Sequence, residues 1–441
     1  MKRASLAILI CFLTLFAQAQ SSWGLKECIT YGLEHHLSNE IYRNNIEKAK
    51  QMKNENVAFY LPQVKGDIYF DDNLKKQTQI FSDETSGDVR EIQLGKHFVT
   101  TASVEVEQAL YDKFLLSSLR GLKPNNAIAR LNFQQNQDGL ICNISQMYVQ
   151  VYVLKQQAAL LQENIRKYET LHEIVKLQVE KGVTKKIEAD RIFVALNNTQ
   201  SQLVVVESNY ELSVNRLKNA MGMDLGEQLP LPDSLDVIPI DTSASAISGF
   251  NAENKTEIQI QKNNLKLLEV QKNRTSAGYF PKLSFYARYG AQSFSNEFSS
   301  AFNNWHDYSS LGLKLNVPIF DSFQKGAQIK QSKINTENAL HNLKLSEDAF
   351  QLQYQNANTQ LKRAQLNLEN TRQNVKLAKD VFDNSALQYQ QGVSPLSEFI
   401  NSETSFKEAQ SNYVGAMLNY YMAVIDLEKA KGTLEAFYRN L

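Results

Sequence analysis

Long stretches of the chain place apolar residues at alternating spacings of three and four. The clearest register includes Ile144, Met147, Val151, Leu154, Ala158, Leu161, Ile165 and Tyr168. This spacing predicts helices that pack side by side as a coiled coil. Segments 112–182 and 321–392 are mostly of this pattern, and at a rise of about 1.5 Å per residue each could extend roughly 100 Å. A second helical run follows each segment and ends near Gly222 or Gly432.

Four shorter segments alternate apolar and polar residues instead. Ala102, Val104 and Val106, for example, alternate with polar neighbours. This period predicts strands with one apolar and one polar face, over 63–70, 97–110, 282–290 and 309–318. Two interpretations stay open: a hairpin half-buried on a soluble core, or the wall of a membrane barrel with lipid outside and water inside. The connections 71–96 and 292–308 are polar and are expected to be loops.

The chain also matches itself. Residues 177–183 match residues 387–393 at an offset of 210, and the same offset pairs Glu188 with Glu398. Because further matches keep the same order, we interpret the chain as two copies of one unit. Each copy has a helix, a proline, two strands and a helical hairpin.

The domain organisation follows from these copies. The first covers 20–222, with a hairpin over 112–222 whose tip is Gly182, and the second covers 253–432, with a hairpin over 321–432 whose tip is Gly392. A proline-containing linker over 223–252 is expected to join them, and a C-terminal tail over 433–441 to follow. Three breakers in the first hairpin predict a kink or a late helix start there, namely Gly121, Pro124 and Gly139.

The N-terminus has the pattern of a signal peptide. Lys2 and Arg3 precede an apolar run over 6–16, and Ala17-Gln18-Ala19 supplies a small-x-small cleavage pattern. We therefore expect residues 1–19 to be removed on export. Cys11 lies inside the apolar run, which argues against a lipoprotein signal.

Composition narrows the classes of function. The 47 basic residues equal the 47 acidic ones, so nucleic acid is not an expected partner. His35 and His36 are adjacent, which points them in different directions on a helix, and no metal site or cofactor is expected. With no nucleophile elbow or phosphate-binding loop, an enzyme is not expected either. Cys28 and Cys142 are expected to be small buried side chains rather than a disulfide.

Several short motifs together resemble the TolC family of outer-membrane efflux proteins. They are Leu61-Pro62 and Phe280-Pro281 before the strands, Tyr111-Asp112 and Ile319-Phe320-Asp321 after them, Gly182-Val183 and Gly392-Val393 at the tips, and Ala220-Met221-Gly222 at a helix end. The resemblance implies a mostly α fold with a β-barrel: a homotrimer in which four strands per chain close a twelve-stranded barrel in outer-membrane lipid. Long coiled-coil helices would continue it as a tunnel through the periplasm of a Gram-negative bacterium.

The resemblance also implies a function. The trimer would be the exit duct of a tripartite efflux or type I secretion system. It would dock a periplasmic adaptor protein and an inner-membrane pump, and it would pass substrates without catalysing energy use itself. The identity of those substrates does not follow from the sequence.

In the family, polar and charged contacts close the duct at the helical tips. Tyr389 falls on the family's tip tyrosine, while Ser394 stands where members place an arginine and Asn401 where they place a pore-lining aspartate. Our hypothesis is a closure that relies on Glu188, Glu398 and nearby cations; the alternative is ordinary solvated helix ends. The candidate gate residues are Gly182, Lys185, Glu188, Arg191, Tyr389, Gly392, Ser394, Glu398 and Asn401.

Two other functions remain as alternatives. A periplasmic adaptor also combines strands with a helical hairpin, but usually with one hairpin rather than two. A structural coiled coil of the envelope would leave the alternating strands without a purpose.

Overall fold

The structure is a computed structural model that describes residues 22–82, 89–232 and 250–441. The expected signal peptide lies outside the described residues, as does most of the linker. The chain divides into two compact units. The first unit is formed by residues 1–44, 130–260 and 343–441, and the second by residues 45–129 and 261–342.

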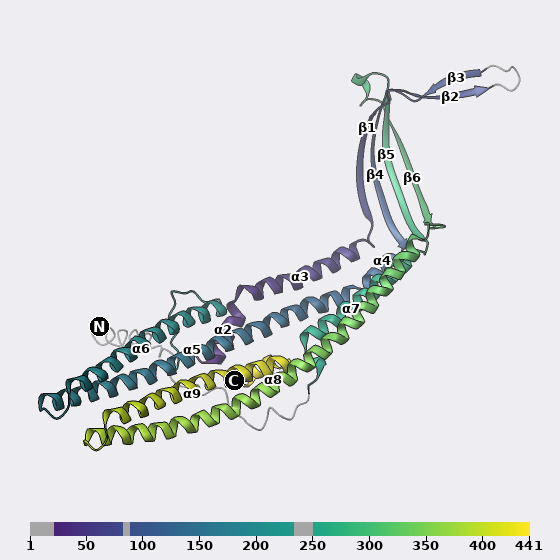
Figure 1. Ribbon diagram of the computed structural model, residues 1–441. Coiled ribbons are helices and arrows are strands. Elements are labelled where there is room, and N and C mark those ends of the chain that lie inside the picture. The colour runs from purple at the N-terminus through teal and green to yellow at the C-terminus, as the bar shows by residue number, and fades with distance from the viewer. Residues whose placement is uncertain (1–21, 83–88, 233–249) are drawn as a thin grey trace, which may run out of the picture. The chain divides into compact units, whose positions relative to one another are not determined.

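The second unit carries a four-stranded antiparallel sheet. Its order is β1 (Gln63–Asp72), β4 (Phe98–Tyr111), β5 (Lys282–Ser295) and β6 (Trp305–Asn316), and the four strands lie side by side in Figure 1. β5 ends later and β6 begins earlier than their alternation indicated, so the connection between them shrinks to residues 296–304, which include η2 (Phe298–Ser300). Each repeat therefore contributes two adjacent strands to one sheet.

The connection between β1 and β4 differs from the expected loop. It contains a second hairpin of β2 (Gln77–Ser82) and β3 (Val89–Leu94), which pair only with each other. The expectation of a plain loop over 71–96 is therefore wrong. These strands are short and carry mostly polar residues, and Ile80 and Ile92 lie on opposite sides of the hairpin, so no alternation along the chain predicts it.

The register of the sheet sorts its residues onto two faces. Val104 of β4 pairs with Tyr289 of β5 on one side of the sheet, while Glu105 pairs with Arg288 on the other side. We call the first side the apolar face, since it continues into Leu311 and Leu313 of β6. On the polar face, Arg288 forms an ion pair with Glu105.

Glycines open room for tyrosine rings on the polar face. Gly312 of β6 pairs with Tyr286 of β5, and a Cβ atom at Gly312 would come within 2.9 Å of the Tyr286 hydroxyl oxygen. Gly290 of β5 pairs with Tyr308 in the same way, and a Cβ atom there would lie 2.9 Å from the Tyr308 ring. Each ring thus covers a glycine on the neighbouring strand, which supports an otherwise weak strand position.

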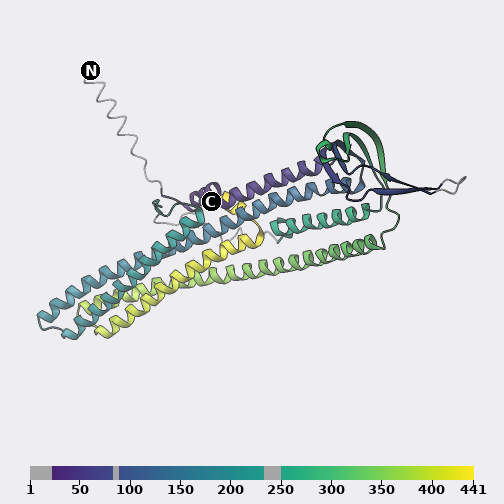
Figure 2. The same ribbon diagram turned by 90° about the horizontal axis from the view of Figure 1, so that it is seen from above.

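The helices account for most of the chain. They are α2 (Leu25–His35), α3 (Leu37–Ala58), α4 (Lys113–Arg120), α5 (Leu122–Glu180), α6 (Lys186–Met221), η1 (Ala252–Asn254), α7 (Thr256–Ala277), α8 (Gln324–Gln390), α9 (Leu396–Lys431) and α10 (Leu434–Asn440). Within the first unit the long helices run side by side (Figures 1 and 2). The segment 433–441, expected as a C-terminal tail, contains the helix α10.

Of the three helix-breaking residues in the first hairpin, only Gly121 coincides with a helix end. The Asp112 carboxylate accepts a hydrogen bond from the Phe114 backbone N–H at 2.8 Å and caps α4, which ends before Gly121. Pro124 lies in the first turn of α5, where its missing N–H costs nothing. Gly139 lies inside α5 without breaking it. The helix therefore starts late, as the breakers suggested, and continues unbroken to the tip.

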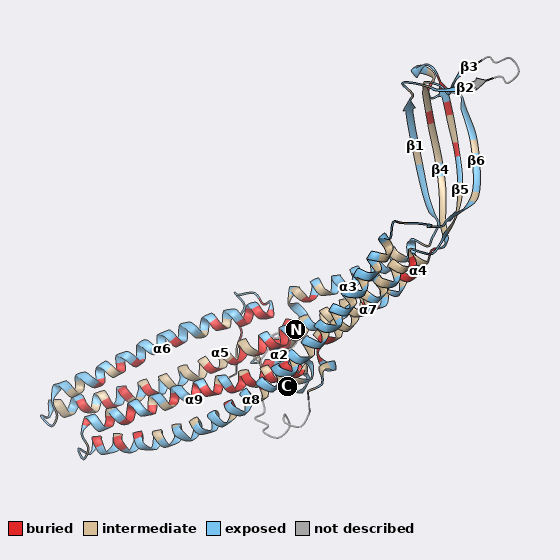
Figure 3. Ribbon diagram, turned by 45° about the vertical axis from the view of Figure 1, so that its right-hand side comes forward, coloured by how far each residue is buried: buried red, intermediate tan, exposed pale blue. Residues whose placement is uncertain are grey.

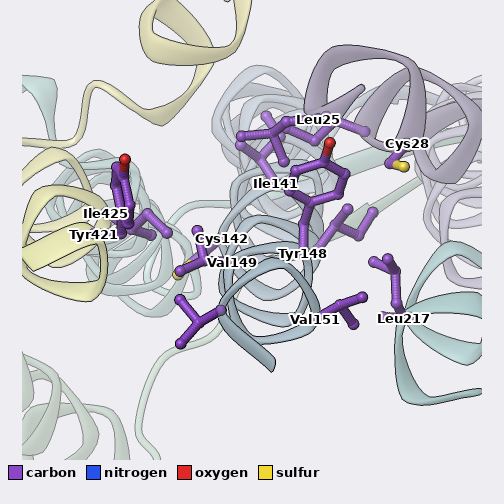
Figure 4. Packing of buried hydrophobic residues seen from close by; sticks show 14 of the residues in the cluster. Leu25, Cys28, Ile141, Cys142, Tyr148, Val149, Val151, Leu217, Tyr421 and Ile425 are labelled. Atoms are coloured by element: carbon purple, nitrogen blue, oxygen red, sulfur yellow. The ribbon is translucent and has the colours of Figure 1, made fainter. Parts of the chain in front are cut away.

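The core of the first unit gathers side chains from α2, α5, α6 and α9. Figure 4 shows Leu25 and Cys28 of α2 facing Tyr148 of α5, with Leu217 of α6 nearby. Cys28 and Cys142 are buried free thiols, as expected. In Figure 3 the buried positions form stripes along these helices, which is the pattern that the three- and four-residue spacing predicts.

Large exposed apolar side chains are distributed unevenly over the long helices. α6 exposes Ile187, Phe193, Val194, Val204, Val205 and Leu212, and the part of α8 in the first unit exposes Leu345, Leu352, Leu366, Leu377, Val381 and Leu387. α5, by contrast, exposes only Leu177, and α9 exposes none among its residues, all of which the structure describes. Among the described residues, no helix is both long and apolar enough to cross a membrane.

Candidate gate at the hairpin tips

The two hairpins turn with the same backbone geometry. Gly182 and Gly392 both have φ of +74°, in the left-handed region that favours glycine. The Val183 N–H donates to the Gln178 carbonyl at 2.9 Å, and the Val393 N–H donates to the Gln388 carbonyl at the same distance. The tips are thus two copies of one turn, which explains why this stretch matches best between the repeats.

A hydroxyl group holds the first glutamate of each helix that follows a tip. Thr184 Oγ1 donates to Glu188 Oε2 at 2.7 Å, and Ser394 Oγ donates to Glu398 Oε2 at 2.7 Å. Both carboxylates lie in the first turn of a helix, where the partial positive charge of the helix favours them. Ser394 therefore takes the same role in the second hairpin as Thr184 in the first.

Tyr389 connects the two hairpins. Its hydroxyl donates to Glu188 Oε2 at 3.2 Å, and its ring is buried beside that of Phe399, with 6.0 Å between the centroids. Burial, together with the negative charge of Glu188, raises the pKa of Tyr389 to about 12. The hydroxyl consequently keeps its proton and stays a donor at physiological pH.

The remaining candidate residues lie at the surface of the tips. Lys185 immediately precedes α6, and its side chain is exposed, as are those of Arg191 and Asn401. Within the described part of one chain, Glu188 and Glu398 are held by hydroxyl groups and take part in no ion pair. A closure that uses cations would therefore need contacts with another copy of the chain.

An aromatic cluster lies directly behind the tips. The Phe382 ring of α8 stacks on that of Phe406 of α9, with 5.3 Å between centroids, and lies 5.4 Å from that of Phe399. The full buried cluster is Tyr168, Leu171, Val175, Ile192, Leu196, Phe382, Tyr389, Leu396, Phe399 and Phe406. Because it draws on α5, α6, α8 and α9, it fixes the two tips against each other.

The sequence reasoning missed a buried polar network next to this cluster. Glu403 of α9 accepts hydrogen bonds from Tyr168 of α5 and from Lys407, whose Nζ lies 2.7 Å away. Lys407 Nζ also donates to Thr199 Oγ1 of α6 at 3.0 Å, so the network joins three helices. One turn further from the tip, Asn164 Nδ2 donates to Gln410 Oε1 at 2.9 Å.

A signal for this network was present in the sequence. Among the buried positions of α9 near the tip, five follow the three- and four-residue spacing, namely Leu396, Phe399, Glu403, Phe406 and Gln410. Two of them are polar in a register that is otherwise apolar. Polar residues at such positions commonly fix the register of neighbouring helices.

A groove of about 570 Å³ opens beside the aromatic cluster, between α5, α8 and α9. Its floor includes Phe382 and Phe406, and its rim carries Lys167, whose Nζ lies 3.5 Å from Asp383 Oδ1. The same Nζ lies 5.1 Å from the Phe382 ring centroid. The groove thus combines an apolar floor with charges of both signs. Among the described residues, no group of three or more His, Cys, Asp or Glu side chains is arranged to hold a metal ion.

Comparison with known proteins agrees with this architecture. The chain is 19% identical over 335 residues to the alkaline protease secretion protein AprF of Pseudomonas aeruginosa. This alignment covers 75% of this chain and 68% of AprF. It is 21% identical over 208 residues to the probable outer membrane lipoprotein SilC of Salmonella typhimurium, which covers 46% of this chain and 44% of SilC.

Solved structures share the fold. The outer membrane channel CmeC of Campylobacter jejuni aligns with a TM-score of 0.74 at 14% identity, covering 95% of this chain and 89% of CmeC. The outer membrane protein VceC of Vibrio cholerae aligns with a TM-score of 0.72 at 13% identity, covering 92% and 96% of the two chains.

The family model for the outer membrane efflux protein matches residues 85–223 and 252–433, which are the two hairpin-bearing parts of the repeats. This match decides between the functions that the sequence left open, in favour of the duct over the periplasmic adaptor. The chain belongs to the outer membrane efflux protein family, and it is an outer-membrane exit duct that extends into the periplasm.

Proposed function

We propose that three copies of this chain close into one duct, which receives substrates from a periplasmic adaptor and an inner-membrane pump. The duct passes the substrates, and the pump supplies the energy. The observation that carries the proposal is the uneven exposure of apolar side chains on the long helices of the first unit.

The sheet supports a ring of several chains. In the sheet that the structure describes, β1 and β6 each have a neighbour on one side only. An open sheet edge leaves backbone N–H and C=O groups unpaired, which lipid does not tolerate. Three copies would supply twelve strands, and β6 of one copy would pair with β1 of the next.

The helices support the same ring. Figures 1 and 3 show α5 and α9 lying between α6 and α8 in the first unit. The exposed apolar stripes belong to these two outer helices. In a head-to-tail ring, α6 of one copy would pack on α8 of the next and bury both stripes. A single chain in water would leave them exposed, which is unfavourable.

The level of each side chain along the helices predicts which residues meet. Val194 follows the tip glycine Gly182 by 12 residues, and Val381 precedes Gly392 by 11. The link between Tyr389 and Glu188 places the two tips at one level. We therefore expect Val194 of one copy to lie close to Val381 of the next.

Paired cysteines test this arrangement. The double variant Val194→Cys plus Val381→Cys should form covalent dimers and trimers on mild oxidation, seen on a non-reducing gel, because Cys28 and Cys142 are buried. The control is Val194→Cys plus Leu345→Cys. Leu345 is at least as exposed on α8 as Val381 but lies 36 residues further from the tip, a rise of roughly 54 Å. Equal cross-linking of both pairs, or none with the first, would sink the proposed ring.

The partners and the gate are the finer parts of the proposal. AprF is named for the secretion of a protease, which makes a secretion or an efflux system the expected setting. The groove beside the aromatic cluster, with its apolar floor and charged rim, is the surface near the tips that best suits a helical segment of an adaptor. The nine candidate residues at the tips would line or support the closure, with the link between Tyr389 and Glu188 holding it shut.

A further inference from the structure

The two edges of the sheet, β1 and β6, are linked in level by the pairing between them (Figure 1). A line straight across the sheet passes through one residue of each strand, namely Gln63, Glu107, Tyr286 and Gly312. In a closed ring, β6 of one copy would meet β1 of the next copy at a seam. The residue of β1 that lies opposite Gly312 at this seam defines its register.

Strand tilt limits how far the two edges are offset at the seam. One copy is four strands wide, or roughly 19 Å. Over this width, an offset of about four residues along β1 gives a tilt of about 35°, and an offset of about six residues gives about 45°. Strands of outer-membrane barrels tilt by about 35–45°, whereas offsets of about two or eight residues would give roughly 20° or 55°.

Other offsets fail on the pattern of side chains. An odd offset would place the apolar face of one copy beside the polar face of the next. An offset in the opposite direction would leave most of β1 without a partner strand, because Gln63 at its start would then meet the first residues of β6. Two registers therefore remain, with either Asp67 or Tyr69 of the next copy opposite Gly312.

Like charges oppose the register that has Asp67 opposite Gly312. On the polar face it sets Lys65 opposite Lys314. On the other face it sets Asp72 opposite Asp307. Like charges directly opposite each other destabilise a strand pair, and this register has one such pair on each face.

The register that has Tyr69 opposite Gly312 brings opposite charges together on the polar face. It sets Lys314 opposite Asp67 of the next copy. It also gives the glycine a purpose at the seam. Gly312 lies under the ring of Tyr286 of its own copy, and the absence of a side chain there leaves room for Tyr69 on the other side.

The same register pairs large apolar side chains on the apolar face. Leu313 meets Ile68, and Leu311 meets Phe70. All four side chains are exposed in one chain, with an exposed fraction of 80% for Ile68 and 79% for Leu311. Cross-strand contacts between aromatic and aliphatic side chains stabilise a strand pair, so both faces favour this register.

We propose that copies of this chain recognise each other in this one register, in which Asp67 of one copy forms an ion pair with Lys314 of the next. The inference rests on the proposed function, since it needs β6 of one copy to pair with β1 of the next. It adds which residues identify the neighbouring copy and why a copy that is shifted along the seam is rejected.

A cysteine scan along β1 measures the register. Lys314→Cys is combined in turn with Lys65→Cys, Asp67→Cys or Tyr69→Cys, which alternate onto the polar face. The protein is oxidised in detergent micelles and separated on a non-reducing gel. Because Cβ atoms directly opposite each other are about 5 Å apart and diagonal ones about 7–8 Å, we expect about fivefold more covalent dimer and trimer with Asp67→Cys than with the other two.

The failures of this scan are distinguishable. A maximum at Lys65→Cys or Tyr69→Cys would overturn the register and leave the ring intact. No cross-linking at any of the three positions, while Val194→Cys plus Val381→Cys still cross-links, would also overturn the register alone. If the helix pair fails as well, the ring and the proposed function fall with it.

Charge reversal tests the ion pair independently of cysteine chemistry. Asp67→Lys places a second cation opposite Lys314, and we expect it to roughly halve the trimer that survives mild heating in dodecyl sulfate. Adding Lys314→Asp should restore the trimer. Asp71→Lys, on the same face of β1, would meet Ser310 and serves as the matched control.

The double variant keeps this test informative even if the single variant folds poorly. A loss with Asp67→Lys that Lys314→Asp does not restore would contradict the ion pair. An equal loss with Asp71→Lys would contradict it too, since any added cation on this face would then have the same effect.

Discussion

Asp138 of α5 is an acidic side chain in an unfavourable place. Burial raises the pKa of Asp138 to about 6, the hydrogen bond from Thr256 Oγ1 at 3.2 Å opposes this, and the charges of Glu257 and Glu435 add to the rise. Because the pKa is raised in the folded state, the folded chain favours the protonated carboxyl. Its contribution to stability is greatest at low pH and is lost as pH rises from about 4 through about 6.

Replacing this carboxyl with an amide should remove that pH dependence. Asp138→Asn keeps an acceptor for Thr256. Because the carboxyl is partly exposed to solvent, we expect the variant to be more stable than the parent by only about 1 kcal/mol at pH 7.5. At pH 4 the variant and the parent should be about equally stable. Thermal unfolding followed by circular dichroism at both pH values measures this. An identical pH response of the two proteins would contradict it.

Single residues also show how far the sequence predicted the site. The tip glycines and the tip tyrosine follow from the internal repeat and from the family resemblance. The bond between Tyr389 and Glu188 joins residues 201 positions apart, and only the packing of four helices brings them together. Glu403 could have been noticed in the sequence, because it interrupts an apolar register. A carboxylate at such a position is nevertheless expected to be exposed to solvent unless its buried partners are known.

At the scale of whole elements, the helix ends offer a matched comparison of glycines. Gly392 and Gly432 both have φ of +74°, but a Cβ atom at Gly392 would meet no atom within 4 Å, whereas one at Gly432 would lie 2.7 Å from the Asn254 carbonyl oxygen. Gly392→Ala should therefore cost only the backbone strain of about 1–2 kcal/mol. Gly432→Ala should cost more, because the Asn254 backbone must also move.

Chemical denaturation of the two alanine variants measures the difference. Gly182→Ala serves as an internal replicate, since its site is equally open and has the same φ. The expected order of stability is Gly182→Ala equal to Gly392→Ala, and both above Gly432→Ala. Equal losses at Gly392 and Gly432 would show that the contact with Asn254 has no energetic weight.

Elements were predictable where the local pattern is strong. The four strands of the sheet alternate clearly, and the long helices keep their register over many turns, so both follow from periodicity. The hairpin β2–β3 and the helix α10 are short and mostly polar or mixed, so no period stands out. Gly139 lies mid-helix against expectation, since neighbouring core contacts of α5, such as Leu140 and Ile141, outweigh the preference of one glycine.

The scale of the whole molecule explains why two repeats are needed. Each repeat supplies two adjacent strands and one helical hairpin, and the tips of both hairpins share one buried cluster. One chain by itself leaves two sheet edges and two apolar helix faces uncovered. The same surfaces that look incomplete in one chain become interfaces when three copies form a ring.

Single-channel conductance in a planar lipid bilayer tests the central claim, a duct closed at its tips, most directly. We predict discrete openings of low conductance for the parent protein and a several-fold higher conductance for Glu188→Ala plus Glu398→Ala, which removes the carboxylates held at both tips. Glu207→Ala plus Glu408→Ala, exposed glutamates on the same two helices away from the tips, should leave the conductance unchanged. A protein that inserts but shows no openings, or whose tip variant conducts no better than the control, would contradict the account.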